Sequence, residues 1–72
     1  MDKVVKDFGS FIKERRIEKG LSQEEVAKML NIRQQTYGRY ELGLREPGLW
    51  VILELSKILN FAPGEFFDSY NL

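Results

Sequence analysis

The sequence contains no cysteine and no histidine among its 72 residues. The lack of cysteine excludes disulfide bonds and thiol nucleophiles, and the two absences together exclude the usual zinc ligands. Nowhere do about 18 apolar residues follow one another, as a membrane-spanning helix requires, and the first residues lack the apolar core of a signal peptide. We therefore expect a protein of the cytoplasm that uses no metal and no cofactor.

The chain also lacks net charge, because 11 basic residues balance 11 acidic ones. This balance argues against a nucleic-acid partner only if the charges are evenly distributed, and they are not. Residues 1–20 hold six basic and four acidic side chains, and residues 31–45 hold three arginines and one glutamate. Residues 46–72 hold four acidic side chains and one lysine. A basic face can therefore form on the N-terminal segments.

Strand signals are missing as well, since no stretch alternates with a period of two and no Asn-Gly or Asp-Gly hairpin turn occurs. A chain of 72 residues buries only about 60–65% of its unfolded surface, which is enough for one small core. With 43% hydrophobic and 31% charged residues, the composition is that of a folded protein. We expect one all-α domain over residues 1–72.

Local signals place the first helices. Phe8 and Ile12 recur at helical spacing, and Gly20 suits the left-handed position that follows a helix, so a helix is expected from residue 4 or 5 to residue 19. Ser22 and Glu25 form the pattern of a capping box, so a second helix should begin at Gln23. Its expected buried stripe is Val26, Ala27 and Leu30, with Asn31 as the helix-ending residue.

The remaining helices follow short punctuation. Only two residues separate Asn31 from the segment Gln34–Leu42, which Gly43 ends, so these two helices must cross steeply. Pro47 marks a loop, and residues 49–60 read as a fourth helix. Its expected core stripe is Leu49, Ile52, Leu53, Ser56 and Leu59. A fifth helix should begin at Pro63, with Phe66 and Phe67 closing the core.

The segment "LSQEEVAKMLNIRQQTYGRYELGLREP", residues 21–47, resembles the helix-turn-helix of the lambda-repressor-like family, the phage-repressor and Cro type of DNA-binding domain. The flanking stretches "FGSFIKERRIEKG" and "LWVILELSKILNFAPGEFF" resemble that family's first and last helices. The positions that carry the resemblance are Gln23, Ala27, Ile32, Glu41, Gly43 and Pro47. The resemblance implies a compact five-helix domain, with a helix-turn-helix over about residues 23–42, that binds operator DNA as a homodimer.

The resemblance also implies an ion pair between Arg16 and Glu41, which would lock the third helix against the first. The alternative is that both are solvated surface charges, which contribute little.

The third helix carries the expected base contacts. Positions 34, 35, 38 and 39 project from one side of it, the side that the family places in the major groove. Glutamine suits adenine and arginine suits guanine, so Gln34, Gln35 and Arg39 are the candidate base readers, and Gly38 leaves room for close approach. The alternative is an ordinary polar helix face.

Candidate contacts to the DNA backbone are Ser22, Gln23, Arg33, Tyr40 and Arg45. Several have competing explanations. Capping alone accounts for Ser22, and Arg45 can instead enter a narrow minor groove or remain a solvated loop charge. Arg33 stands where the family often has a capping residue and cannot itself cap the helix. The Tyr40 ring either packs in the core or reaches a phosphate, whereas packing is the better interpretation for Tyr37.

The run "LWVIL" is apolar throughout, yet a surface helix buries only one stripe. If the stripe above faces inward, Trp50 and Val51 face outward, and exposed tryptophan is enriched at interface centres. We therefore expect a homodimer contact at Leu44, Trp50 and Val51. The alternative is that Trp50 lies over the edge of the core.

The function expected from these features is sequence-specific binding of double-stranded DNA by a transcriptional regulator associated with the nucleoid, most simply a repressor at a palindromic operator. The rival interpretation is a protein-interaction module that keeps the fold without reading DNA, which the neutral net charge favours. An enzyme is not expected, because no histidine, cysteine, phosphate loop or suitable carboxylate pair is present.

Overall fold

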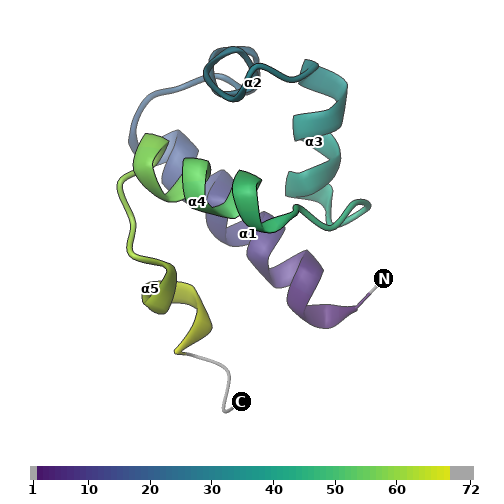
Figure 1. Cartoon of the computed structure of the whole chain (residues 1–72), viewed down its shortest axis with the longest axis vertical. Helices are drawn as coiled ribbons and strands as arrows, with labels where there is room; N and C mark the ends of the chain where they lie inside the picture. The colour runs from purple at the N-terminus through teal and green to yellow at the C-terminus, as the bar shows by residue number, and fades with distance from the viewer. Residues whose placement is uncertain (1, 69–72) are drawn as a thin grey trace.

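Five α-helices make up most of residues 2–68, the part of the chain described by the computed structural model (Figure 1). They are α1 (Lys3–Glu18), α2 (Gln23–Leu30), α3 (Gln34–Leu42), α4 (Leu49–Ile58) and α5 (Pro63–Phe67). These residues contain no strand, so the all-α architecture expected from the sequence is confirmed. None of the helices within residues 2–68 has the length and apolar character needed to cross a membrane.

The ends of α2 follow the local signals in the sequence. The Ser22 hydroxyl accepts a hydrogen bond from the Glu25 amide at 3.0 Å, and the Glu25 carboxylate accepts one from the Ser22 amide at 2.9 Å. At the other end Asn31 adopts the left-handed conformation, with φ of 57°. The predicted capping box and helix end are therefore both confirmed.

A short turn sets α3 steeply against α2. Figure 1 shows α2 nearly end-on at the top of the molecule, while α3 runs down the page from it. The Ile32 amide in this turn donates to the Ala27 carbonyl at 3.0 Å, and its side chain packs against the core. Ala27 itself is buried, which suits the close contact between the two helices.

Helix α1 lies against α3 at unusually short range. A Cβ atom added at Gly9 would lie 2.5 Å from the carbonyl oxygens of both Tyr40 and Glu41. One turn earlier in α1, the Cα of Lys6 lies 2.7 Å from where a Cβ at Gly43 would be. Gly43 also has a positive φ of 71°. Glycine is required at both positions, and the two contacts fix α1 beside α3.

The core face of α4 differs from the sequence-based expectation. Leu49 and Leu53, expected to be inside, are 87% and 51% exposed, whereas Val51 and Leu55 are buried. Ser56 and Leu59 are buried as predicted. Because the start of this helix is apolar on every side, hydropathy alone does not determine its rotation, and packing against α2 and α5 selects the face. The expected outward orientation of Val51 was therefore wrong.

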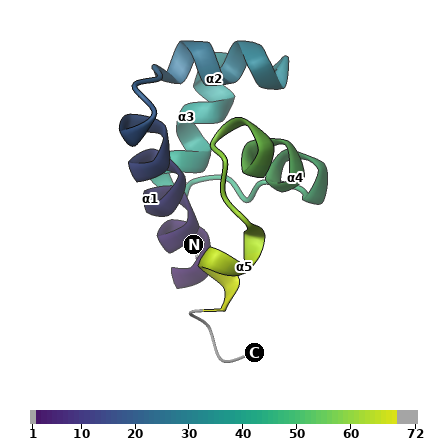
Figure 2. The same cartoon turned by 90° about the vertical axis from the view of Figure 1, so that its left-hand side faces the viewer.

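Helix α5 is held to α1 by aromatic rings. Phe8 makes an edge-to-face contact with Phe66 of α5 at a centroid distance of 5.1 Å, and Phe11 makes one with Phe61, in the segment before α5, at 5.0 Å. Arg15 lies 5.2 Å above the Phe11 ring and also pairs with Glu65. Figure 2 shows α5 beneath the other helices, next to the start of α1. Phe66 is buried and Phe67 packs against the core, as expected.

Alanine substitution should distinguish the two glycines that lie inside helices α1 and α3. Gly9→Ala forces a methyl group onto two carbonyls and should lower the free energy of unfolding by about 1–3 kcal/mol. Gly38→Ala meets only the Gln23 side chain, at 3.4 Å, and should raise the free energy of unfolding by about 0.5–1 kcal/mol through helix propensity. Urea denaturation followed by circular dichroism measures both. Equal stabilisation by the two substitutions would contradict the close packing of α1 on α3.

Candidate nucleic-acid interface

The outer face of α3 forms a shallow depression with the start of α2. It is lined by Gln23, Gln34, Gln35, Gly38, Arg39 and Leu42. The four positions predicted to face the major groove are therefore brought together on one surface. We refer to it as the readout face.

The side chains of this face are free to meet a ligand. Gln34, Gln35 and Arg39 are all exposed. Gly38 is half-buried, and a Cβ atom added there would have only the Gln23 side chain within 4 Å. Glycine here keeps the floor of the depression low, so that an incoming group can approach the backbone of α3.

Helix α3 is fixed to α1 by a buried ion pair at the edge of the readout face. Arg16 Nε donates to Glu41 Oε2 at 2.7 Å, and Arg16 Nη2 donates to Glu41 Oε1 at 3.2 Å. The two side chains are only 12% and 2% exposed. The predicted pair is therefore present, and the alternative of two solvated charges was wrong. Arg16 Nη1 also donates to the Leu21 carbonyl at 2.8 Å, just before α2.

Neighbouring polar groups keep the Glu41 carboxylate ionised despite its location. Burial raises its pKa, but the surrounding polar groups of Arg16, Tyr37 and Gln23 together lower the pKa by more than burial raises it. The pKa of Glu41 therefore lies below its ordinary value. In return, hydrogen bonding to Glu41 raises the pKa of Arg16. Gln23 Nε2 donates to Glu41 Oε1 at 3.0 Å. Gln23 lines the readout face, so this hydrogen bond connects the ion pair to that face.

The two tyrosines of α3 pack inside the molecule. Tyr37 is fully buried and Tyr40 is 5% exposed, with their rings in an edge-to-face contact at 6.5 Å. The Tyr37 hydroxyl lies beside the Arg16–Glu41 pair without a well-formed hydrogen bond, and burial raises its pKa. Tyr40 follows Tyr37 by three residues and so shares its inward side. Packing, one of the two alternatives for Tyr40, is the one observed, and the expected phosphate contact is not supported.

The other candidate backbone contacts lie at the start of α2 and on either end of α3. Ser22 is exposed at the start of α2, although its hydroxyl already accepts the capping hydrogen bond. Arg33 is exposed immediately before α3 and makes no capping bond, as expected. Arg45 is exposed in the loop that follows α3. Gln23 is half-buried and held by Glu41.

A second depression adjoins the readout face and was not predicted. It is lined by Lys6, Ser10, Lys13, Gln23, Glu41 and Leu42, and it shares Gln23 and Leu42 with the first. Lys6, Ser10 and Lys13 come from the exposed side of α1. The repeat of polar residues at positions 6, 10 and 13 is visible in the sequence, but nothing local shows that it lies beside α3.

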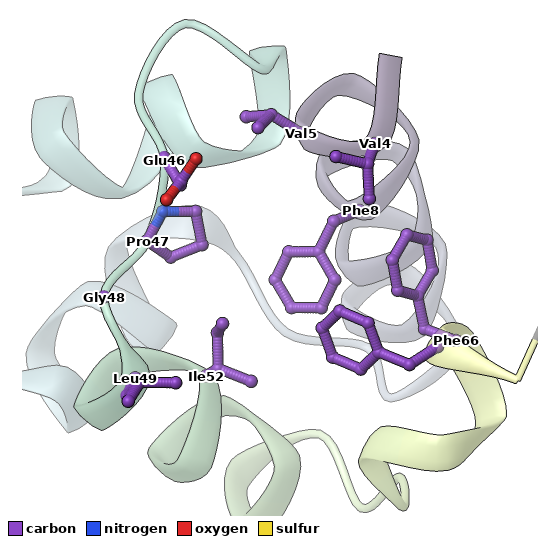
Figure 3. Close-up of a pocket in the computed structure, with 10 residues that line it drawn as sticks. Val4, Val5, Phe8, Glu46, Pro47, Gly48, Leu49, Ile52 and Phe66 are labelled. Carbon is purple, nitrogen blue, oxygen red and sulfur yellow. The ribbon is translucent and has the colours of Figure 1, made fainter. Parts of the chain in front are cut away.

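A separate apolar surface surrounds the start of α4. Leu44, Leu49, Trp50 and Leu53 are all more than half exposed. Leu49 also lines the groove in Figure 3, with Pro47 and Ile52 on its side, Val4 and Phe8 on the other, and Phe66 from α5. Two of the three expected dimer residues, Leu44 and Trp50, are thus accessible, whereas Val51 is buried.

Comparison with known proteins decides the family. The helix-turn-helix family model matches residues 12–66, which include the ion pair and the whole readout face. The chain belongs to the helix-turn-helix family. The resemblance to lambda-repressor-like domains is confirmed, and helix-turn-helix proteins of this kind are DNA-binding transcriptional regulators and not enzymes.

Two curated relatives of this helix-turn-helix chain are named as regulators of phage origin. It is 46% identical over 55 residues to the uncharacterized prophage-derived HTH-type transcriptional regulator YonR of Bacillus subtilis, covering 76% of this chain and 51% of that protein. It is 40% identical over 58 residues to the phage CTXphi transcriptional repressor RstR of Vibrio cholerae, covering 81% and 52%. The chain thus spans about half the length of these two relatives.

A solved structure matches nearly the whole helix-turn-helix fold. The restriction-modification controller protein C.AhdI of Aeromonas hydrophila superposes with a TM-score of 0.78 at 39% sequence identity. The match covers 89% of this chain and 96% of that protein. The five-helix arrangement is therefore shared with a protein of similar size.

Substitution of Glu41 tests the role of the ion pair in this helix-turn-helix. Glu41→Gln leaves the buried guanidinium of Arg16 without a carboxylate and should lower the free energy of unfolding by about 3 kcal/mol at neutral pH. The pKa of Glu41 is depressed in the folded state, so its stabilisation is complete above the ordinary value of 4.5 and is lost as the pH falls through the folded value. The stability difference between wild type and variant should therefore shrink below pH 4.5. A difference independent of pH would contradict this account.

Proposed function

We propose that the chain is the DNA-binding unit of a transcriptional repressor that binds a palindromic operator as a homodimer, with α3 in the major groove. The observation that carries the proposal is the readout face, where Gln34, Gln35, Gly38 and Arg39 line one surface of a helix that a buried ion pair fixes to α1. A rigid support is what base readout needs, because hydrogen bonds to base edges discriminate only when the donors are well positioned.

The chemistry of this face suits the edges of base pairs. A glutamine amide matches the donor and acceptor of adenine, and arginine donates twice to guanine. Backbone contacts from Ser22, Gln23, Arg33 and Arg45 would surround these readers and set the register of the protein on the duplex. Tyr40 is not part of this proposal, since its ring lies in the core.

The apolar surface at the start of α4 supports a homodimer. Leu44 and Trp50 are 60% and 57% exposed, and Leu49, next to Trp50 in the sequence, lines the groove in Figure 3. A second copy of the chain is the proposed partner, because two copies related by a two-fold axis can cover this surface with the same residues from each. Such a dimer would present two α3 helices about 34 Å apart, one turn of DNA.

Repression needs no chemistry beyond this binding. A dimer that occupies an operator overlapping a promoter excludes the polymerase by its presence. One relative, RstR, is named as a transcriptional repressor, which supports this direction of control. The protein would act in the cytoplasm, at the nucleoid.

Selection of bound duplexes from a random DNA pool is the first test. The wild-type chain should enrich a palindrome whose half-sites are centred about one helical turn apart. Gln35→Ala and Arg39→Ala should each cost about 1–3 kcal/mol on the selected duplex and relax the base preference at one position of each half-site.

Lys57→Ala is the matched control for these variants, because Lys57 lies on α4 away from the readout face and should leave binding unchanged. Equal weakening on selected and random duplexes by Gln35→Ala and Arg39→Ala would refute the assignment of base readers. If the wild type enriches no sequence even at low salt, the proposal fails and a protein-interaction module takes its place.

Serine substitution tests the dimer surface. Trp50→Ser should shift the chain from dimer to monomer in sedimentation equilibrium. A tryptophan at an interface centre often contributes about 2 kcal/mol or more to the free energy of association. Ile17→Ser is the control, since Ile17 is also 57% exposed and lies near the end of α1. If both variants keep the association constant of the wild type, the dimer does not use this surface.

A further inference from the structure

The depression beside the readout face has the composition of an anion-binding surface. Lys6, Ser10 and Lys13 line one side of it, all three exposed and all from α1. It meets the readout face at Gln23 and Leu42, which line both depressions. A molecule large enough to cover the readout face therefore extends over this part of α1.

The position of α1 relative to α3 is fixed by backbone contacts. Gly9 lies between Lys6 and Ser10 in the sequence and packs against the carbonyls of Tyr40 and Glu41. Lys6 itself packs by its Cα against Gly43, the residue that ends α3. The side chains of Lys6, Ser10 and Lys13 therefore start from a backbone that cannot shift away from the readout face.

The charges of this depression are available to a ligand. Neither Lys6 nor Lys13 makes an ion pair within residues 2–68, whereas Lys3 pairs with Asp7 and Lys57 pairs with Glu54. Glu41 also lines the depression, but its carboxylate is compensated by the two hydrogen bonds from Arg16. The exposed charge of the depression is therefore positive.

We propose that Lys6, Ser10 and Lys13 bind phosphates of the same DNA duplex that α3 reads. The step from Lys6 to Lys13 corresponds to about 10 Å along the helix, so the two ammonium groups reach different phosphates. The ligand class is the phosphodiester backbone, bound without regard to sequence, with Ser10 as a neutral hydroxyl donor between the charges. This proposal rests on the proposed function and extends the DNA footprint from the helix-turn-helix onto α1.

The test is the salt dependence of binding by a Lys6→Gln/Lys13→Gln double variant of the full 72-residue chain. Two probes are used, the duplex selected by the wild type and a random-sequence duplex of equal length. The variant should bind both probes about tenfold more weakly near physiological salt, and the slope of log K against log salt should fall by about 2 per chain. The base preference should stay unchanged.

Lys57→Gln is the matched control, since it removes one exposed positive charge from α4 and should not change the slope by more than about 0.2. The double variant should keep the circular dichroism spectrum of the wild type, because both substituted side chains are exposed.

Three results separate this inference from the proposed function. A wild-type slope in the double variant overturns the role of α1, while the selected sequence still supports the proposed function. A loss confined to the selected duplex also overturns it, because phosphate contacts weaken binding to both probes alike. If the wild type itself binds neither probe, the inference and the proposed function fall together.

Discussion

The pair between Arg16 and Glu41 is the interaction on which the arrangement of this small domain depends. It joins α1 to α3 directly, and it reaches the start of α2 through the Leu21 carbonyl and the Gln23 amide. Burying two charges costs desolvation energy, which is offset only when geometry and additional hydrogen bonds are good. Here the additional bonds come from the segments whose relative positions matter, so the pair specifies geometry as well as adding stability.

The sequence predicts well those parts of the fold that local chemistry decides. The capping box at Ser22, the left-handed Asn31 and the left-handed Gly43 each mark a helix end through interactions of neighbouring residues. The bounds of α2 and α3 were therefore predicted correctly, and positions 34, 35, 38 and 39 follow from helical geometry once α3 is placed. The link between Arg16 and Glu41 is not local and was predicted only through the family resemblance.

The sequence fails where several packings have equal local support. The start of α4 is apolar on every side, so the choice of Val51 and Leu55 over Leu49 and Leu53 is made by the neighbouring helices. The proposed role of α1 in DNA binding is also not visible in the sequence, because it too depends on contacts between distant segments. Lys6 and Lys13 are ordinary surface lysines in the sequence, and only the contact of Gly9 with α3 brings their side of α1 next to the readout face. Tyr40 was undecided because a tyrosine suits both a core and a phosphate.

The hydrogen bond from Gln23 to Glu41 has a consequence for the polarity of the readout face. An ionised carboxylate accepts hydrogen bonds and donates none, so the amide of Gln23 must turn its nitrogen toward Glu41. Its oxygen then lies over Gly38, 3.4 Å from where a Cβ would be. The exposed amides of Gln34 and Gln35 can rotate to suit a partner, but that of Gln23 cannot without breaking its bond to Glu41. The buried pair thus dictates, from inside the molecule, the position of a permanent acceptor on its outer surface.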